Sequence, residues 1–159
     1  MGAISPVPRE GRPFQGQQAG LVTRLVANTV DALTVSVVLL ALHVGINALM
    51  FLVSPRNFEF ATASVLLSVT IALLAMLVYM TIAWSITGRT YGDHVMGLRV
   101  VGRHGDRVWP PTALVRAALC VGFPIGLLWC GVSTSRRSVQ DVLLRTSVIY
   151  DWRPRRATR

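Results

Sequence analysis

The segment Leu21–Leu42 constrains this chain most, because it is almost entirely apolar and yet contains Arg24 and Asp31. About 20 apolar residues, each rising ~1.5 Å along a helix, cross the hydrocarbon core of a bilayer. Asp31 is about ten residues into the segment and is therefore expected well inside that core. A charge near the bilayer centre costs about 2.5–3.5 kcal/mol on insertion scales, so both side chains need partners within protein. The segment predicts a membrane helix that carries a polar site.

The composition favours an integral membrane protein. Of the 159 residues, 52% are hydrophobic and only 14% are charged, whereas soluble proteins have roughly 25% charged residues. The length predicts one domain. The net charge is +9, and all 16 basic residues are Arg. A basic excess beside apolar spans indicates cytoplasmic loops that face anionic lipid headgroups, so the expected partner is the bilayer rather than nucleic acid.

Two further apolar segments follow the first. Residues 61–86 contain no charged residue and form the cleanest predicted span, and Tyr79 and Trp84 near its end suit an interfacial anchor. Thr112–Val132 contains Arg116 near its start and a Gly/Pro-rich break around Pro124. The length of this third segment allows one full crossing of the membrane. Its Gly/Pro break also suits an element that enters the membrane and returns, whose freed backbone groups need protein neighbours.

Short polar elements complete the predicted fold. Leu98–Val101 is expected to be a strand that pairs either with a return strand at Arg107–Trp109, as a hairpin, or with Ser147–Tyr150. Ser138 followed three residues later by Asp141 predicts the capped start of a short helix. The predicted class is an all-α membrane protein, a small transmembrane helical bundle with two full spans, a Pro/Gly-broken third hydrophobic segment and a short cytoplasmic β-hairpin or strand pair.

The arginines predict the orientation. One Arg lies between the first two segments, four lie in residues 88–111, and seven follow residue 132. The positive-inside rule then places both termini in the cytoplasm. The expected organisation is a disordered cytoplasmic arm over residues 1–19, a transmembrane domain over residues 20–150 and a basic tail over residues 151–159. Three full spans with an external tail are the competing topology.

The chain resembles the RDD family of bacterial membrane proteins in three places. Arg24 and Asp31 in the first span and Asp141 in the tail match the family's Arg-Asp-Asp pattern. GRTYGDHVMGLRVV and SRRSVQDVLLRTSVIY are similar to the family's loop after the second span and its closing segment. The resemblance covers about residues 19–150. It departs from the pattern at Asp93-His94, where a basic pair is usual, and at residues 142–146, which lack the usual Ala-Gly step.

The resemblance implies a multi-pass protein of the bacterial inner, or plasma, membrane. Some family members are linked to cation–proton exchange, and others accompany larger transport or envelope systems. Two hypotheses follow: a cation or proton transport component that uses a polar intramembrane site, or an accessory or assembly subunit whose polar stripe docks another membrane protein. Either one implies a homo-oligomer or other membrane-protein subunits as partners.

The candidate site follows from helical spacing. Arg24, Asn28 and Asp31 share one helix face. Asp31 is either a proton or cation site, or a structural carboxylate bonded to Arg24 or to hydroxyls of the second span. Asp141 is either a helix cap or the partner of an arginine. That arginine would be one such as Arg24 or Arg99, and the possible salt-bridge partners of the whole polar site, Arg24, Asn28, Asp31 and Asp141, are Arg99 and Arg116.

Other chemistry is not expected. The sequence contains no nucleophile–base arrangement, phosphate-binding loop or pair of carboxylates at catalytic spacing, so we expect no enzyme and no cofactor. Asp93, His94, His104 and Asp106 lack metal-ligand spacing and are interpreted as surface turn residues, so no metal is expected. Cys120 and Cys130 are interpreted as small, inert, buried residues.

Overall fold

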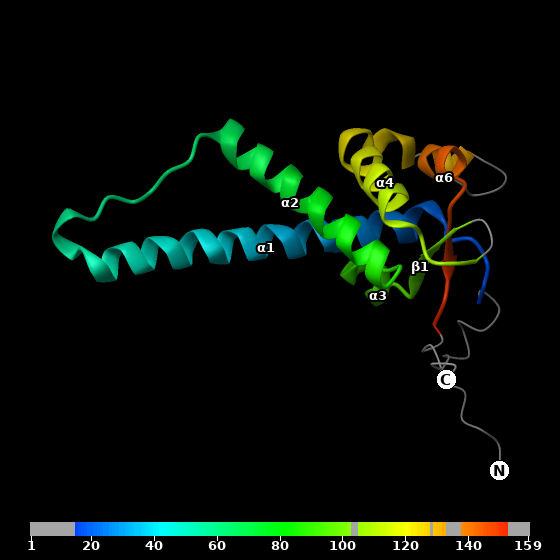
Figure 1. Ribbon diagram of the computed structural model, residues 1–159, viewed down its shortest axis with the longest axis horizontal. Coiled ribbons are helices and arrows are strands. Elements are labelled where there is room, and N and C mark those ends of the chain that lie inside the picture. Colours follow the sequence, from blue (N-terminus) through cyan, green and yellow to red (C-terminus); the bar gives the residue numbers. More distant parts are fainter. Residues whose placement is uncertain (1–14, 103–104, 128, 133–137, 153–159) are drawn as a thin grey trace, which may run out of the picture.

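The computed structural model describes residues 15–102, 105–127, 129–132 and 138–152. Two long helices form a hairpin that extends to one side, and the shorter elements gather at the other end (Figure 1). We call the described parts of residues 15–31 and 87–152 the headpiece. The elements, in chain order, are α1 (Leu21–Val53), η2 (Pro55–Asn57), α2 (Val65–Ile86), α3 (Tyr91–Val95), β1 (Leu98–Val101), α4 (Pro110–Gly122), η3 (Pro124–Leu127), α5 (Trp129–Val132), α6 (Val139–Leu144) and β2 (Ser147–Tyr150).

The two long helices have the length and composition of membrane spans. Helix α1 has 33 residues and α2 has 22, and these are the two candidate spans among the described residues. Only 6% of the most apolar stretch of each helix is buried. A core helix of a soluble protein would bury most of such a stretch, so the apolar surface of this hairpin needs lipid or another protein around it.

Helix α1 is longer than one membrane crossing. At ~1.5 Å per residue its 33 residues extend about 50 Å, against a hydrocarbon core of about 30 Å. The first third of the helix packs inside the headpiece, where Arg24, Ala27 and Asp31 are buried. The helix ends at Val53 with Ser54 as its C-cap, and Pro55, the next residue, prevents its continuation.

The strands form a small sheet within the headpiece. Strand β1 pairs antiparallel with β2, with Val100 opposite Val148 as predicted. The hairpin alternative is wrong, because residues 107–109 form no strand and Trp109 instead caps the start of α4. Residues 16–19 hydrogen-bond to the other edge of β2, for example from the Ala19 amide to the Val148 carbonyl at 2.9 Å.

This ladder brings distant parts of the chain to one end of the molecule. Residues 15–19 belong to the folded headpiece rather than to the arm expected over residues 1–19, and residues 1–14 of that arm lie outside the described part. Asp151 and Trp152 also pack on the headpiece, where Asp151 receives hydrogen bonds from Arg89 and Arg99. The rest of the predicted tail, residues 153–159, lies outside the described residues as well. The start of α1 and the end of β2 are therefore on the same side of the hairpin.

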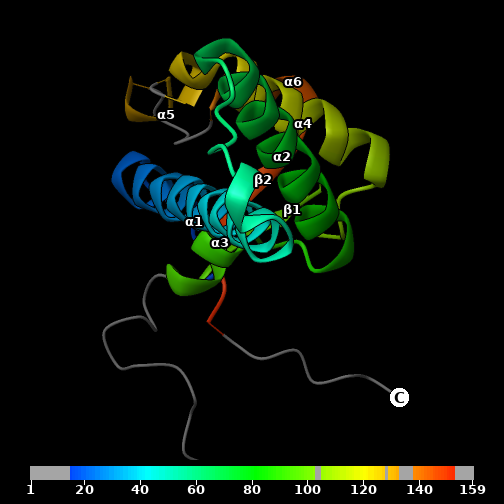
Figure 2. The same cartoon turned by 90° about the vertical axis from the view of Figure 1, so that its left-hand side faces the viewer.

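The third apolar segment is broken, as its Gly/Pro content indicates. It divides into α4, η3 and α5, and α4 packs along the second half of α2. Met80 and Trp84 of α2 and Ala113 and Ala117 of α4 are buried in the resulting core. Helix α3 lies on the opposite side of α1 from α4 and α6 (Figure 2). The 13 residues of α4 extend only about 20 Å, too short for a full crossing.

Candidate functional site: two buried aspartates at the base of the hairpin

Asp31 is fastened to the segment that follows the second span. Its side chain is 1% exposed. One carboxylate oxygen accepts hydrogen bonds from the Tyr79 hydroxyl at 2.8 Å and the Gly92 amide at 2.7 Å, and the other accepts one from the Thr90 hydroxyl at 2.6 Å. Of the two kinds of partner expected for Asp31, the structure shows a hydroxyl of the second span. Three donors make this carboxylate a junction of α1, α2 and α3.

The position of Asp31 differs from the sequence-based expectation. Thr90 and Gly92 follow α2, which ends at Ile86, so Asp31 lies near the headpiece end of the hairpin rather than at its middle. The physical reason is the length of α1, whose first third belongs to the headpiece. Asp31 therefore lies where a polar group can reach the partners that a membrane helix at mid-depth would lack.

Gly92 permits the close approach of α3 to α1. A Cβ atom at this residue would be 2.0 Å from the carbonyl oxygen of Ala27 and 3.0 Å from the carboxylate carbon of Asp31. No side chain fits in that space. The glycine thus allows its amide to point directly at the Asp31 carboxylate.

Asp141 holds two arginines from different helices. Its side chain is 0% exposed, and Arg24 of α1 and Arg116 of α4 are each 3% exposed. Arg24 donates to one carboxylate oxygen, and Arg116 donates to the other at 2.5 Å. Arg24 also donates to the Ala19 carbonyl, and Arg116 donates to the Thr146 hydroxyl. Asp141 therefore links the first span, the broken third segment and the strand that follows α6.

The charge of Asp141 is retained despite its burial. Burial alone would raise the pKa of the carboxyl, but the nearby charges of Arg116 and Arg24 and their hydrogen bonds outweigh it and lower the pKa to about 2. Asp141 is also a helix cap, because Ser138 and Asp141 form a reciprocal capping box at the start of α6. The sequence predicted that Asp141 is either a helix cap or the partner of an arginine, and the structure shows that it is both.

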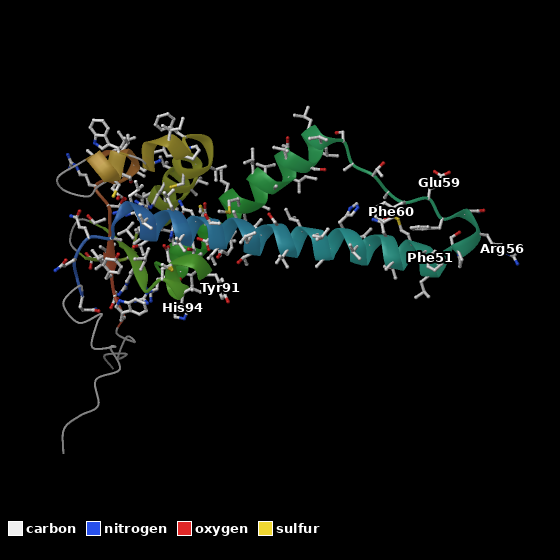
Figure 3. The ribbon with its side chains drawn as sticks, turned by 180° about the vertical axis from the view of Figure 1, so that it is seen from behind. Phe51, Arg56, Glu59, Phe60, Tyr91 and His94 are labelled. Carbon is white, nitrogen blue, oxygen red and sulfur yellow. The ribbon has the colours of Figure 1, made fainter. Side chains whose placement is uncertain are left out.

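A second capping box was missed by the sequence analysis. Thr90 and Asp93 form it at the start of α3, and Asp93 is buried rather than a surface turn residue. Asp93 accepts a hydrogen bond from the Trp84 indole at 2.9 Å. The Thr-x-x-Asp spacing, which repeats the Ser-x-x-Asp spacing of the tail, was the available signal. His94 is exposed and projects from α3 together with Tyr91 (Figure 3).

A small cavity with both polar and apolar lining residues lies between the two aspartate clusters. It is lined by Arg24, Asn28, Trp84, Asp93, Val100, Arg116, Cys120 and Val148. The centre of a water molecule can move through about 20 Å³ of it, and about 10–15 Å³ is enough to hold one water. The guanidinium carbon of Arg116 lies 5.1 Å from the Trp84 ring centroid, close enough for a cation–π contact. The polar stripe of α1 therefore faces the interior of this chain.

The remaining candidate residues are distributed as follows. Of the two possible salt-bridge partners of the site, Arg116 pairs with Asp141. Arg99 lies on β1 and instead pairs with Asp151 at 3.2 Å. Cys130 is buried, and Cys120 is partly buried beside the cavity. Among the described residues, no group of three or more His, Cys, Asp or Glu side chains is arranged to hold a metal ion.

The fold and the site together define the class of this protein: an apolar helical hairpin that is fastened at its base to a small headpiece by buried aspartates. The RDD family profile matches residues 18–145, and the chain belongs to the RDD family of membrane proteins. No curated protein and no solved structure matches the chain.

Proposed function

We propose that this RDD family chain is an accessory or assembly subunit of a larger membrane complex. The observation that carries the proposal is the full engagement of both family aspartates within the chain. Asp31 accepts three hydrogen bonds, and Asp141 is held by two arginines. A carboxylate that takes up and releases a cation or proton needs an accessible position. These two instead serve to fasten the headpiece to the hairpin.

The apolar sides of the hairpin support this role and revise its docking surface. The polar stripe of Arg24, Asn28 and Asp31 faces the chain's own headpiece, so it is not available to a partner. Leu33 and Leu40 of α1 and Leu66 of α2 are well exposed. Packing against the helices of another membrane protein would cover such residues.

A cation or proton transport component is the second candidate. The water-sized cavity favours it, because Asn28, Arg24, Asp93 and Arg116 surround a space where one water could bind. The two candidate spans among the described residues do not enclose a path across a bilayer. Transport would therefore need a homo-oligomer or additional subunits.

Orientation belongs to the same proposal. We place the headpiece end of the hairpin at the cytoplasmic face of the inner membrane of a bacterial cell, because arginines are concentrated in the headpiece loops and rare between the two spans. A reporter fused after Arg159 should then be active only in the cytoplasm. Activity confined to the periplasm would reverse the orientation.

Reconstitution separates the two candidate functions. The purified chain is placed alone in liposomes, and cation-driven proton movement is followed with a pH-sensitive dye, beside empty liposomes and the Asp31→Asn variant. As an accessory subunit, the wild-type chain should give the same signal as empty liposomes. A flux that the wild type carries and Asp31→Asn abolishes, with insertion unchanged, would overturn the accessory role.

Crosslinking in native membranes tests the positive side of the proposal. A photoreactive amino acid at Leu40, on the exposed side of α1, should give one discrete adduct with another membrane protein. The matched control places it at Asp106 in the exposed headpiece loop, where that adduct should be missing. Adducts with lipid or with a second copy alone at Leu40 would contradict docking through this face.

A further inference from the structure

Helix α6 is amphipathic in the reverse sense of a helix on a soluble protein. Its buried residues are Gln140 and Asp141. Its exposed residues are apolar, with Val142 at 56% and Leu143 at 66% exposure, and Val139 exposed as well. A soluble surface helix buries the apolar side and exposes the polar side. Exposure of the outer side of α6 to water is therefore unfavourable, and an apolar environment suits it better.

Helix α4 repeats the same pattern. It buries Arg116 between Ala113 and Ala117, and it exposes Leu114 and Val115. In a membrane, by contrast, ionisable side chains face the protein interior and apolar side chains face lipid. The two helices together thus turn their polar residues toward the hairpin and their apolar residues outward.

The described elements that follow α4 continue the apolar surface. Phe123, Ile125 and Trp129 are all exposed in the region of η3 and α5. The helix break frees backbone carbonyls, and the carbonyl of Phe123 accepts a hydrogen bond from the Gln140 side chain at 3.0 Å. Irregular backbone is tolerated at membrane depth only where protein satisfies its polar groups. The bond from Gln140 meets that requirement at this carbonyl.

The location of this surface relative to the hairpin indicates what covers it. Helix α4 packs along the second half of α2, one of the two candidate spans. Figure 2 shows α4, α5 and α6 on one side of the molecule beside α2, with α3 opposite. The exposed apolar surface of the spans therefore continues directly onto α4 and α6. A lipid leaflet that surrounds α2 would reach both helices.

We propose that α4, η3, α5 and α6, which we call the outer layer, are immersed in the lipid leaflet on the headpiece side of the membrane. The leaflet's acyl chains contact Leu114, Val115, Ile125, Trp129, Val142 and Leu143. The outer layer enters the membrane without crossing it, and its buried arginine and aspartate face the first span. The chain thus has two full crossings and one half-immersed layer.

Spin labels measure the solvent of the outer layer directly. Single cysteines at Val115 and Leu143, in a Cys120→Ala, Cys130→Ala background, are labelled and reconstituted in liposomes. Collisions with oxygen, which concentrates in lipid, are compared with collisions with a nickel chelate, which stays in water. In these liposomes, which contain no other membrane protein to cover α1, a label at Leu40 provides the lipid reference, and a label at Asp106 provides the aqueous reference.

Both test positions should show the oxygen collisions of Leu40 and a loss of the chelate collisions seen at Asp106. Chelate collisions equal to those at Asp106 would show that the layer faces water and would overturn the proposal. Protection from both reagents would show that protein, such as a second copy, covers the layer, and would also overturn it.

A second measurement avoids the cysteine replacements. A diazirine amino acid at Leu143 in the otherwise unaltered chain should form adducts with phospholipid on illumination in liposomes. A matched diazirine at Asp106 should form none. Equal lipid labelling at the two positions, or protein adducts alone at Leu143, would contradict immersion.

Discussion

Replacing Asp141 by Asn tests whether a buried charge fastens the headpiece to the hairpin. The substitution keeps the size of the side chain and an oxygen that can accept the Ser138 amide of the capping box. It removes the charge that neutralises Arg24 and Arg116, which are each 3% exposed. Two buried arginine charges would then lose the carboxylate that they share.

The expected loss of stability can be bounded in two ways. Breaking a buried ion pair by removing one partner costs about 3–5 kcal/mol. The lowering of the Asp141 pKa from 3.8 to about 2 corresponds independently to ~2 kcal/mol of stabilisation of the charged form. We therefore expect Asp141→Asn to lower the free energy of unfolding by roughly 2–5 kcal/mol.

Asp151→Asn is the matched control, because Asp151 also receives two arginines. Arg89 and Arg99 donate to it, but Asp151 is 15% exposed and water screens the pair. Because solvent screens a partly exposed pair more than a buried one, we expect Asp151→Asn to cost less than Asp141→Asn. Both variants can be unfolded in mixed micelles by titration with SDS and followed by tryptophan fluorescence. Equal losses in the two variants would refute the argument that burial makes the Asp141 charge essential.

Three further predictions concern the same junction. Gly92→Ala should lower the free energy of unfolding by at least about 1–3 kcal/mol through overpacking, since the new Cβ would meet a backbone carbonyl at 2.0 Å. Gly45→Ala is the control and should be neutral or stabilising, because a Cβ there would meet nothing within 4 Å. Thermal unfolding in detergent compares the two variants. Tyr79→Phe removes a donor to Asp31 and should lower the free energy of unfolding by about 1.5–3 kcal/mol, as for a hydrogen bond to a charged group. SDS titration measures this loss, and an unchanged unfolding midpoint would contradict it. Because the pKa of Asp141 falls to about 2 on folding, its contribution is present above pH 3.8 and is lost as the pH falls through about 2; acid unfolding should therefore be less steep in Asp141→Asn.

Much of the fold could be predicted from local sequence. Uninterrupted apolar runs predict the two long helices because a helix satisfies its own backbone in lipid. Pro124 and its neighbouring glycines predict the broken third segment, and the Ser138–Asp141 spacing predicts the capped α6. The β-branched residues predicted strands at Leu98–Val101 and Ser147–Tyr150, but the sequence left open whether Leu98–Val101 would pair with Ser147–Tyr150 or with Arg107–Trp109.

The partners of the charged residues were decided by the tertiary structure. Asp31 lies in an apolar helix and Asp93 in a polar loop sequence, yet both are buried. Whether an aspartate is buried depends on which elements pack over it, and local sequence does not show this. The sequence could place Arg24 and Asp31 on one face of α1, but it could not show that α4 and α6 would supply Arg116 and Asp141 to that face, because these residues are separated from Arg24 by about a hundred positions.

The outward apolar faces of α4 and α6 illustrate the same limit. Their sequences are amphipathic, and periodicity identifies two sides without saying which side is buried. Ion pairing decides it, because Asp141 of α6 pairs with Arg24 of α1 and with Arg116 of α4, which turns these charged residues inward. The sequence by itself thus determined the elements and their chemistry, while the tertiary structure determined which residues meet, since electrostatic pairing acts between surfaces that only the folded chain brings together.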